Sequence, residues 1–264
     1  MTTGAFFREA GSGPGVVCLH SNASTSGQWR ALMEMLAPRF HVLAADSYGA
    51  GKSPPWPAGR QVSLRDEVAL LEPVFAGAGD PFALVGHSYG AAIALITAFS
   101  QRGRVRALAL YEPTLFSLID ADSPPPNDAD GIKDAVAAAA AYLDAGDPER
   151  AAECFIDYWM GKGAWAGMPA PRQAPIAASV ANIRGWAWAL MRELTSLAAL
   201  RSVDIPVLYM LGGASPASSR GVARLLTRTL PQVEVVEFEG LGHMAPVTHP
   251  EPVNDAIARF LERV

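Results

Sequence analysis

Short apolar runs alternate with segments of helical periodicity along most of the chain. The runs are continuous, which is typical of strands buried on both faces of a parallel sheet. The alternation predicts right-handed βαβ units, and therefore an α/β fold with a mostly parallel central sheet flanked by helices. The predicted strands are Val16–His20, His41–Asp46, Phe82–Gly86, Val105–Tyr111, Val207–Leu211 and Val233–Phe238. The predicted helices lie near residues 27–37, 63–76, 89–101, 219–230 and 250–262.

The stretch from about 116 to 202 breaks this alternation. It contains the turn-forming sequence Ser123-Pro124-Pro125-Pro126-Asn127-Asp128, which is followed by the alanine-rich helical segment Ile132–Ala145. No strand pattern occurs in it. We interpret residues 116–202 as an all-helical cap, inserted into a core made of residues 1–115 and 203–264 and lying over the ends of its strands.

Composition and charge exclude several classes of protein. Hydrophobic residues make up 50% of the 264 residues and charged residues only 18%, as expected for a folded domain and not for a disordered chain. The net charge is −5, and no basic stripe is present to neutralise phosphates, so we expect no nucleic-acid partner. No apolar run reaches the roughly 18 residues of a membrane span.

The localisation and assembly of the protein are expectations from the same composition. The first residues, Met1–Gly4, lack the basic and apolar regions of a signal peptide. Two cysteines, Cys18 and Cys154, cannot form a disulfide scaffold. We therefore expect a cytoplasmic protein, without a membrane partner, that acts as a monomer or a homodimer.

The strongest chemical signal is Gly86-His87-Ser88-Tyr89-Gly90, a G-x-S-x-G sequence between an apolar strand and an alanine-rich helix. This pattern is typical of a sharp, strained turn that lifts a serine hydroxyl above a sheet, where small flanking residues let strand and helix approach closely. The alternative is an ordinary strand–helix turn. The strand–turn–helix context favours Ser88 as a nucleophile.

A serine nucleophile needs a base, and the chain has five histidines. His243 follows the last predicted strand in a glycine-rich loop, and the order serine, then distant histidine, is the one found in α/β-hydrolases. His249 lies at a helix entry and is expected to have a capping or packing role. His87, beside the nucleophile, is expected to be structural, and His41 to lie at the surface where its strand begins. His243 is therefore the candidate base.

With these residues in place, the whole chain resembles the α/β-hydrolase family with a helical cap. Leu19-His20-Ser21-Asn22-Ala23-Ser24 is similar to the family's HG-x oxyanion loop, although Ser21 stands where the family usually has glycine. Asp46-Ser47-Tyr48-Gly49-Ala50-Gly51-Lys52-Ser53 is similar to its D-x-x-G-x-G-x-S loop, and Gly240-Leu241-Gly242-His243 to its C-terminal signature. The resemblance spans residues 6–263. It implies seven or eight strands, with the cap inserted after the sixth strand of the family.

The resemblance also implies an oxyanion hole made by the backbone N–H groups of Asn22 and Tyr89. Each such donor contributes roughly 3 kcal/mol of transition-state stabilisation in enzymes of this kind. The side-chain amide of Asn22 could add a further donor, or it could hydrogen-bond its own loop.

The third member of the triad is not at the family's most frequent position. After the predicted strand Val207–Leu211 the chain reads Gly212-Gly213-Ala214-Ser215-Pro216, without a carboxylate. Some branches of the family place the acid at the end of the preceding strand, and there this sequence has Tyr111-Glu112-Pro113. We assign Glu112 as the acid. The remaining alternatives are Glu239, Asp120 and Asp122.

The cap is rich in tryptophan, methionine and phenylalanine. Most of these side chains are expected to form its core, but some must face the serine, and such a pocket suits an apolar acyl or aryl group. The candidate pocket residues are His20, Phe116, Trp159, Trp165 and Trp186. An anchor for a substrate carboxylate is not evident, since Arg184 and Arg192 both occupy positions expected to be exposed.

These residues predict a serine hydrolase that cleaves a small, largely apolar ester through an acyl-enzyme, with a Ser88–His243–Glu112 triad. Lactone, thioester or carbon–carbon (diketone) hydrolysis would use the same machinery, and a ligand-binding protein on a hydrolase fold is the alternative of another class. No cofactor and no metal are expected. Gly51-Lys52-Ser53 lacks the earlier glycine of a phosphate-binding loop, and no cysteine–histidine cluster has metal-ligand spacing.

Overall fold

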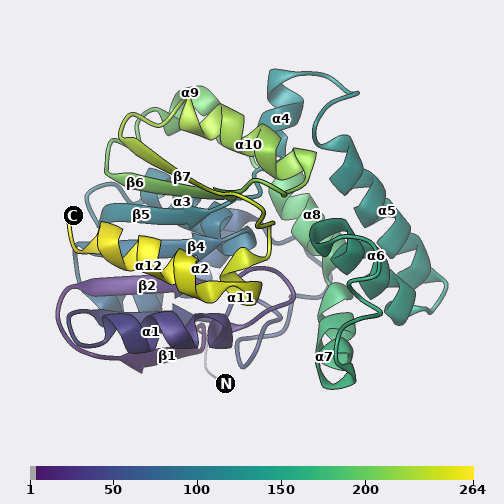
Figure 1. Cartoon of the computed structure of the whole chain (residues 1–264), viewed down its shortest axis with the longest axis horizontal. Coiled ribbons are helices and arrows are strands. Elements are labelled where there is room, and N and C mark those ends of the chain that lie inside the picture. The colour runs from purple at the N-terminus through teal and green to yellow at the C-terminus, as the bar shows by residue number, and fades with distance from the viewer. Residues whose placement is uncertain (1–3) are drawn as a thin grey trace.

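A seven-stranded sheet in the order β1-β3-β2-β4-β5-β6-β7 forms the centre of the computed structural model, which describes residues 4–264 (Figure 1). Strand β1 is antiparallel to β3, and every other neighbouring pair is parallel. The α/β prediction with a mostly parallel sheet is confirmed. The strands are β1 (Phe7–Ala10), β2 (Gly15–Leu19), β3 (His41–Ala45), β4 (Phe82–His87), β5 (Val105–Tyr111), β6 (Val207–Gly212) and β7 (Val233–Phe238).

The burial of the strands explains which of them the sequence reveals. Every residue of β2 and β4 is buried, so both appear in the sequence as continuous apolar runs. The edge strand β1 was not predicted from the hydrophobic pattern, because its four residues are exposed or only partly buried. The other edge strand, β7, has no fully buried residue either, but its valines and phenylalanine keep a strand pattern.

Two layers of helices cover the sheet. Apolar side chains of α2, α3 and α10 pack on one face, and those of α1 and α12 pack on the other. The bounds agree with the predicted helices to within a few residues, and the predicted helix near 27–37 is a 3-10 turn (Ser26–Trp29) that continues into α1. These helices are α1 (Arg30–Leu36), α2 (Leu64–Ala78), α3 (Tyr89–Ser100), α10 (Ala217–Thr227), α11 (Ala245–Thr248) and α12 (Pro250–Leu261).

Six helices and no strand occupy the described chain between β5 and β6. Most of them stand together at one end of the sheet, next to the carboxyl ends of the parallel strands, whereas the short α9 lies apart from them (Figure 1). Carboxyl ends of parallel strands are where open α/β sheets bind ligands, so this position places the inserted helices over the candidate site. They are α4 (Ser117–Asp122), α5 (Asp130–Asp144), α6 (Pro148–Met160), α7 (Ala170–Val180), α8 (Ile183–Met191) and α9 (Leu197–Leu200).

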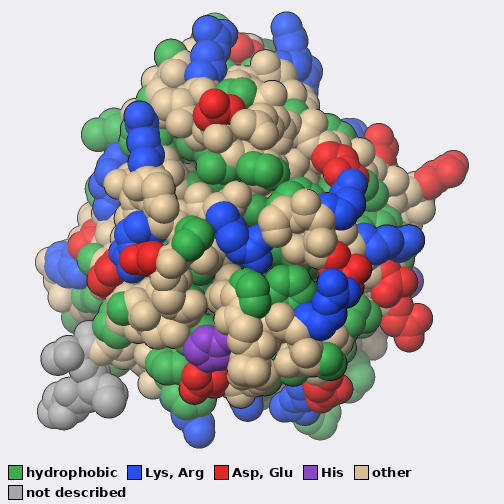
Figure 2. Space-filling view, turned by 90° about the vertical axis from the view of Figure 1, so that its left-hand side faces the viewer, with side chains coloured by type: hydrophobic (Ala, Val, Ile, Leu, Met, Phe, Trp, Pro, Cys, Tyr) green, Lys and Arg blue, Asp and Glu red, His purple; other side chains and the backbone are tan. Residues whose placement is uncertain are grey.

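The surface on the side away from these helices carries acidic and basic side chains interspersed among polar and apolar ones (Figure 2). None of the helices in residues 4–264 has both the length and the apolar character that crossing a bilayer would need.

Candidate active site

Ser88 lies at the tight turn between β4 and α3, with φ +56° and ψ −115°. Its hydroxyl is held above the carboxyl end of the sheet. The two glycines of the motif are required by space: a Cβ on Gly86 would lie 2.5 Å from Cα of Ala91, and one on Gly90 would lie 2.3 Å from the carbonyl oxygen of Leu19. These glycines let strand and helix approach closely enough to force the strained turn, as in a nucleophile elbow.

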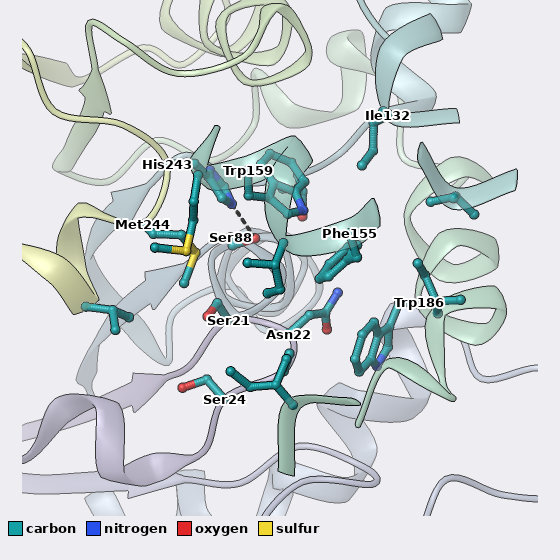
Figure 3. A pocket seen from close by; sticks show the side chains of 18 of the residues that line it. Ser21, Asn22, Ser24, Ser88, Ile132, Phe155, Trp159, Trp186, His243 and Met244 are labelled. Atoms are coloured by element: carbon teal, nitrogen blue, oxygen red, sulfur yellow. Dashed lines mark hydrogen bonds between the residues drawn. The ribbon is translucent and has the colours of Figure 1, made fainter. Parts of the chain in front are cut away.

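His243 lies in the loop between β7 and α11, and its ring reaches Ser88 (Figure 3). The Nε2 atom of His243 is 2.9 Å from Oγ of Ser88, so it can accept the hydroxyl proton. Two side chains fix the backbone of this loop. His87 donates from Nε2 to the carbonyl oxygen of His243 over 2.8 Å, and Tyr111 donates its hydroxyl to the carbonyl oxygen of Gly242 over 2.9 Å.

Glu112 follows β5 and completes the chain of hydrogen bonds. Nδ1 of His243 donates to its Oε2 over 2.6 Å, while its Oε1 accepts from the N–H of Gly212 (2.7 Å) and from the hydroxyl of Ser215 (2.6 Å). Burial alone would raise the pKa of Glu112, but the bonds from His243, Ser215 and Gly212 hold that pKa below its ordinary value. The carboxylate is therefore ionised at neutral pH and can orient the imidazole.

The end of β6, the loop after it and the first turn of α10 supply donors where the family more often supplies the acid. Ser215 and the N–H of Gly212 both face Glu112, and the hydroxyl of Ser219 lies 3.4 Å from Nδ1 of His243. The roles of Ser215 and Ser219 were missed in the sequence. The sequence signal that could have revealed these roles is the run of glycine, alanine, serine and proline residues at 212–219, where the family usually has the carboxylate.

Glu112 also has φ +45°, although it is not a glycine. In residues 4–264, the other non-glycine residues with positive φ are Ser88 and Ala23. All three lie in the triad or line the pocket beside it. Unfavourable backbone conformations persist where the surrounding structure holds them, and they cluster at functional sites. Their gathering here is independent support for this region as the active site.

Gln28 connects the oxyanion loop to the loop of His243. Its Oε1 accepts from both the backbone N–H and the hydroxyl of Ser21, each over 3.2 Å, and its Nε2 donates to Nδ1 of His87 over 3.1 Å. Because Nε2 of His87 bonds the carbonyl of His243, a continuous chain joins the two loops. Ser21, which departs from the family's glycine, thus has a defined partner, and Gln28 is a residue whose role was missed in the sequence.

The two expected oxyanion donors come from the loop after β2 and from the start of α3. Tyr89 is the first residue of α3, where backbone N–H groups have no partner within the helix. Asn22 lines the pocket, and its side-chain amide points into it (Figure 3). Within the described structure this amide makes no hydrogen bond to its own loop, which favours the role of a donor to a ligand over that of a loop brace.

A pocket of about 120 Å³ opens at Ser88 and His243, under the inserted helices (Figure 3). Its wall is mainly apolar, and it includes three of the predicted pocket residues, Phe116, Trp159 and Trp186. The other apolar side chains of its wall are Ala23, Ile132, Val136, Phe155, Ile156, Met160, Met168, Ile176, Ile183, Ala187, Leu190, Met191, Met244 and Val247. Such a wall suits an apolar group of a few carbon atoms.

The structure places His20 and Trp165 away from this pocket, in contrast to their assignment from the sequence. Both ring nitrogens of His20 are used inside the loop, since Nδ1 bonds the carbonyl of Ser21 (2.7 Å) and Nε2 accepts from the N–H of Ser47 (3.1 Å). Burial lowers the pKa of His20. The ring of Trp165 is buried in the core of the inserted helices, and its backbone N–H donates to Asp157.

Two further histidine predictions have different outcomes. His41 begins β3 and bonds Glu9 near the surface, as expected. His249 precedes α12, but it is exposed and its side chain makes no capping hydrogen bond; its Nδ1 contacts the hydroxyl of Thr248. The expected capping or packing role of the His249 side chain is therefore wrong, because the side chain is exposed and makes no hydrogen bond to the helix end.

No group of three or more His, Cys, Asp or Glu side chains in residues 4–264 is arranged to hold a metal ion. The loop that contains Gly51-Lys52-Ser53 is held in place by Asp46. Its carboxylate accepts from the backbone N–H groups of Ser26 (2.6 Å) and Lys52 (3.0 Å), so it organises two loops beside the pocket.

The described geometry and a match to the family model "Alpha/beta hydrolase family" over residues 16–256 agree, and the chain belongs to this family of hydrolases. It is 29% identical over 261 residues to the 2-(acetamidomethylene)succinate hydrolase of Mesorhizobium japonicum, covering 97% of this chain and 90% of that one. It is 27% identical to the pimeloyl-[acyl-carrier protein] methyl ester esterase of Chromobacterium violaceum, covering 97% and 98%. An α/β hydrolase from Sphaerobacter thermophilus, 28% identical, superimposes with a TM-score of 0.71 and covers 94% and 95%.

Proposed function

We propose that this hydrolase cleaves a small, largely apolar ester by acyl transfer to Ser88. The observation that carries the proposal is the unbroken chain from Oγ of Ser88 through His243 to Glu112, with distances of 2.9 and 2.6 Å. A ligand-binding protein would have no need for a buried carboxylate aligned on the imidazole. Among the relatives, one is named for the hydrolysis of a methyl ester, which is the same class of reaction.

The reaction begins when the Ser88 hydroxyl attacks the ester carbonyl carbon and Nε2 of His243 takes its proton. Glu112 stabilises the imidazolium that forms. The oxyanion receives hydrogen bonds from the N–H groups of Asn22 and Tyr89. The alcohol leaves with the proton from His243, which gives the acyl-enzyme. A water molecule, deprotonated by His243, then attacks the acyl carbon and releases the acid and free Ser88.

The size and lining of the pocket set the expected substrate. A cavity of about 120 Å³ between Ser88 and the apolar side chains of Phe155 and Trp186 accommodates a short acyl chain, and longer chains must extend into the opening. We therefore expect hydrolysis of p-nitrophenyl esters to peak at one short chain length, where the pocket is filled, and to decline beyond it.

The test is the hydrolysis of p-nitrophenyl esters from acetate to decanoate, measured as kcat/KM beside a Ser88→Ala variant. A single maximum that depends on Ser88 supports the proposal. A diketone and a lactone of matched size are measured in parallel. If the enzyme cleaves the diketone or the lactone in a Ser88-dependent way but cleaves no ester, the triad acts on a carbon–carbon bond or a lactone and not on a linear ester. If it cleaves none of these compounds, a ligand-binding protein is indicated.

A further inference from the structure

Arg172 is the only Lys or Arg side chain in the described wall of the active-site pocket, and no acidic residue lines this pocket. It lies in the first turn of α7, within the inserted helices. Since the chain as a whole carries a net charge of −5, an acid-free pocket with one guanidinium departs from the general charge of the protein. The position therefore favours negatively charged over positively charged ligands.

A second cavity of about 580 Å³, here called the outer groove, adjoins the pocket through lining residues that the two share. It lies between α7 and two loops of the core, residues 23–25 and 49–51. Four residues line both the pocket and the groove: Ala23, Ser24, Arg172 and Ile176. Arg172 therefore lies where the pocket and the outer groove meet. The outer groove has no acidic residue in its described wall either.

The guanidinium of Arg172 has no partner among the residues that the structure describes. It makes no ion pair and no side-chain hydrogen bond within residues 4–264, whereas Arg184, on the neighbouring α8, bonds the carboxylate of Asp144 over 2.6 Å. An arginine that is free of such a partner at the junction of an apolar pocket and an open groove can bind a carboxylate with two parallel hydrogen bonds.

We propose that Arg172 binds a carboxylate at the far end of the acyl chain, so that the substrate is the monoester of a dicarboxylic acid. This inference rests on the proposed ester hydrolysis and adds the second functional group of the substrate. The ester carbonyl lies at Ser88, the methylene chain fills the apolar pocket, and the free carboxylate reaches the junction with the outer groove.

The test compares monomethyl esters of dicarboxylic acids, from succinate to suberate, with methyl esters of neutral acids of the same chain length at pH 7.5. For the best chain length, the wild type is expected to prefer the anionic ester by at least about tenfold in kcat/KM, mainly through KM, as charge-assisted hydrogen bonds in binding sites allow. Arg172→Gln is expected to remove that preference, and Arg172→Lys, which keeps the charge, to retain part of it.

The matched control is Arg192→Gln, an exposed arginine at the end of α8 that lines neither cavity. It should keep the wild-type ratio of anionic to neutral ester. An equal ratio in wild type and Arg172→Gln, with neutral esters still hydrolysed, would overturn the role of Arg172 and leave the ester hydrolase in place. Absence of serine-dependent turnover on both series would overturn the proposed function, and this inference with it.

A different observation concerns Trp159, on α6. Its indole stacks on the imidazole of His243, with ring centroids 4.0 Å apart and an interplanar angle of 26° (Figure 3). The rings of Phe116, Phe155 and Tyr158 surround the indole, and the hydroxyl of Tyr158 bonds Oγ of Ser218 over 2.7 Å. The face of the indole is thus held against the catalytic base by packing and by a bond to α10 of the core.

We infer that Trp159 is a positioning residue that stabilises the imidazolium of His243 during acyl transfer. The π face of tryptophan attracts a cation and not a neutral ring, so its effect is greatest when His243 holds the serine proton. The titratable groups that face His243 are Glu112, bonded to Nδ1, and His87, whose ring centroid lies 5.2 Å away. Substitution of Trp159 leaves both in place.

The experiment is the pH profile of kcat/KM for Trp159→Leu, which keeps an apolar cover, and for Trp159→Phe, which keeps a smaller π face. Loss of the stack removes stabilisation of the protonated ring, so the acid limb of the Leu variant is expected to move to lower pH, with kcat about tenfold below wild type. For Trp159→Phe, both the acid limb and kcat should lie between those of wild type and Trp159→Leu. Trp186→Leu, in the same pocket wall but on α8, should change KM and leave the acid limb in place. Coincident acid limbs in wild type and Trp159→Leu would overturn this role.

Discussion

Replacing Ser88 by alanine is expected to lower kcat for ester hydrolysis by about 10⁴-fold or more, because within residues 4–264 no other hydroxyl or thiol hydrogen-bonds Nε2 of His243. Alanine keeps the Cβ and the strained φ of +56° at the turn, and the removed hydroxyl contributes one hydrogen bond to the fold. The melting temperature should therefore change by no more than a few degrees. The measurement is kcat/KM on the best p-nitrophenyl ester, with thermal unfolding of the same preparations.

A covalent probe separates the loss of the nucleophile from a general loss of the site. A fluorophosphonate should label wild type at Ser88, as peptide mass spectrometry can show, and should leave Ser88→Ala unlabelled. The control is Ser12→Ala, which removes the hydroxyl of an exposed serine that lines neither cavity and should keep both the labelling and the activity. Turnover by Ser88→Ala within tenfold of wild type would mean that the nucleophile lies elsewhere.

The nucleophile turn and the sheet could be predicted from sequence because they depend on local patterns. The buried strand β4, the two glycines around Ser88 and the helix after it are contiguous, and each requirement acts over a few residues. The same holds for the buried strands, whose apolar runs reflect burial on both faces. The edge strand β1 has no such run, and it is identifiable only by its pairing with β3.

The rest of the site depends on contacts between distant segments. The donors that hold Glu112 come from Gly212 and Ser215, about a hundred residues further along the chain. Gln28 likewise bonds His87 across 59 positions. A glutamine in a short helix is normally a surface residue, so nothing local indicates that it joins two catalytic loops.

The direction of a side chain is the other quantity that a local pattern does not determine. Trp159 and Trp165 are six residues apart and both buried, yet one ring stacks on His243 and the other packs among the inserted helices. His20 follows a buried strand at the carboxyl edge of the sheet, but its ring turns into the loop to bond Ser21 and Ser47. Arg172 differs from His20 in the opposite sense: it occupies an exposed position on a helix, and yet it lines the pocket.

Replacing Glu112 by glutamine is expected to lower kcat by about 10³–10⁴-fold while the protein stays folded. The side-chain oxygen of glutamine can still accept from Gly212 and Ser215, so no buried donor loses its partner. The amide nitrogen, however, would donate to Nδ1 of His243, which forces the ring proton onto Nε2 and leaves it unable to accept from Ser88. The measurement is kcat/KM on the best ester, with Glu239→Gln, an exposed acid near His243 in sequence, as the control expected to match wild type.

The pKa of Glu112 adds a dependence on pH that tests the same assignment. Because this pKa is lowered in the folded state, the ionised carboxylate stabilises the fold at neutral pH, and the stabilisation is lost as the pH falls through the folded-state pKa. The difference in unfolding free energy between wild type and Glu112→Gln should therefore shrink on acidification, as denaturant titrations between pH 7 and pH 3 can measure. Equal turnover by wild type and Glu112→Gln would remove Glu112 from the triad. A difference in stability that stays constant with pH would show that its carboxylate is not held ionised by His243, Ser215 and Gly212.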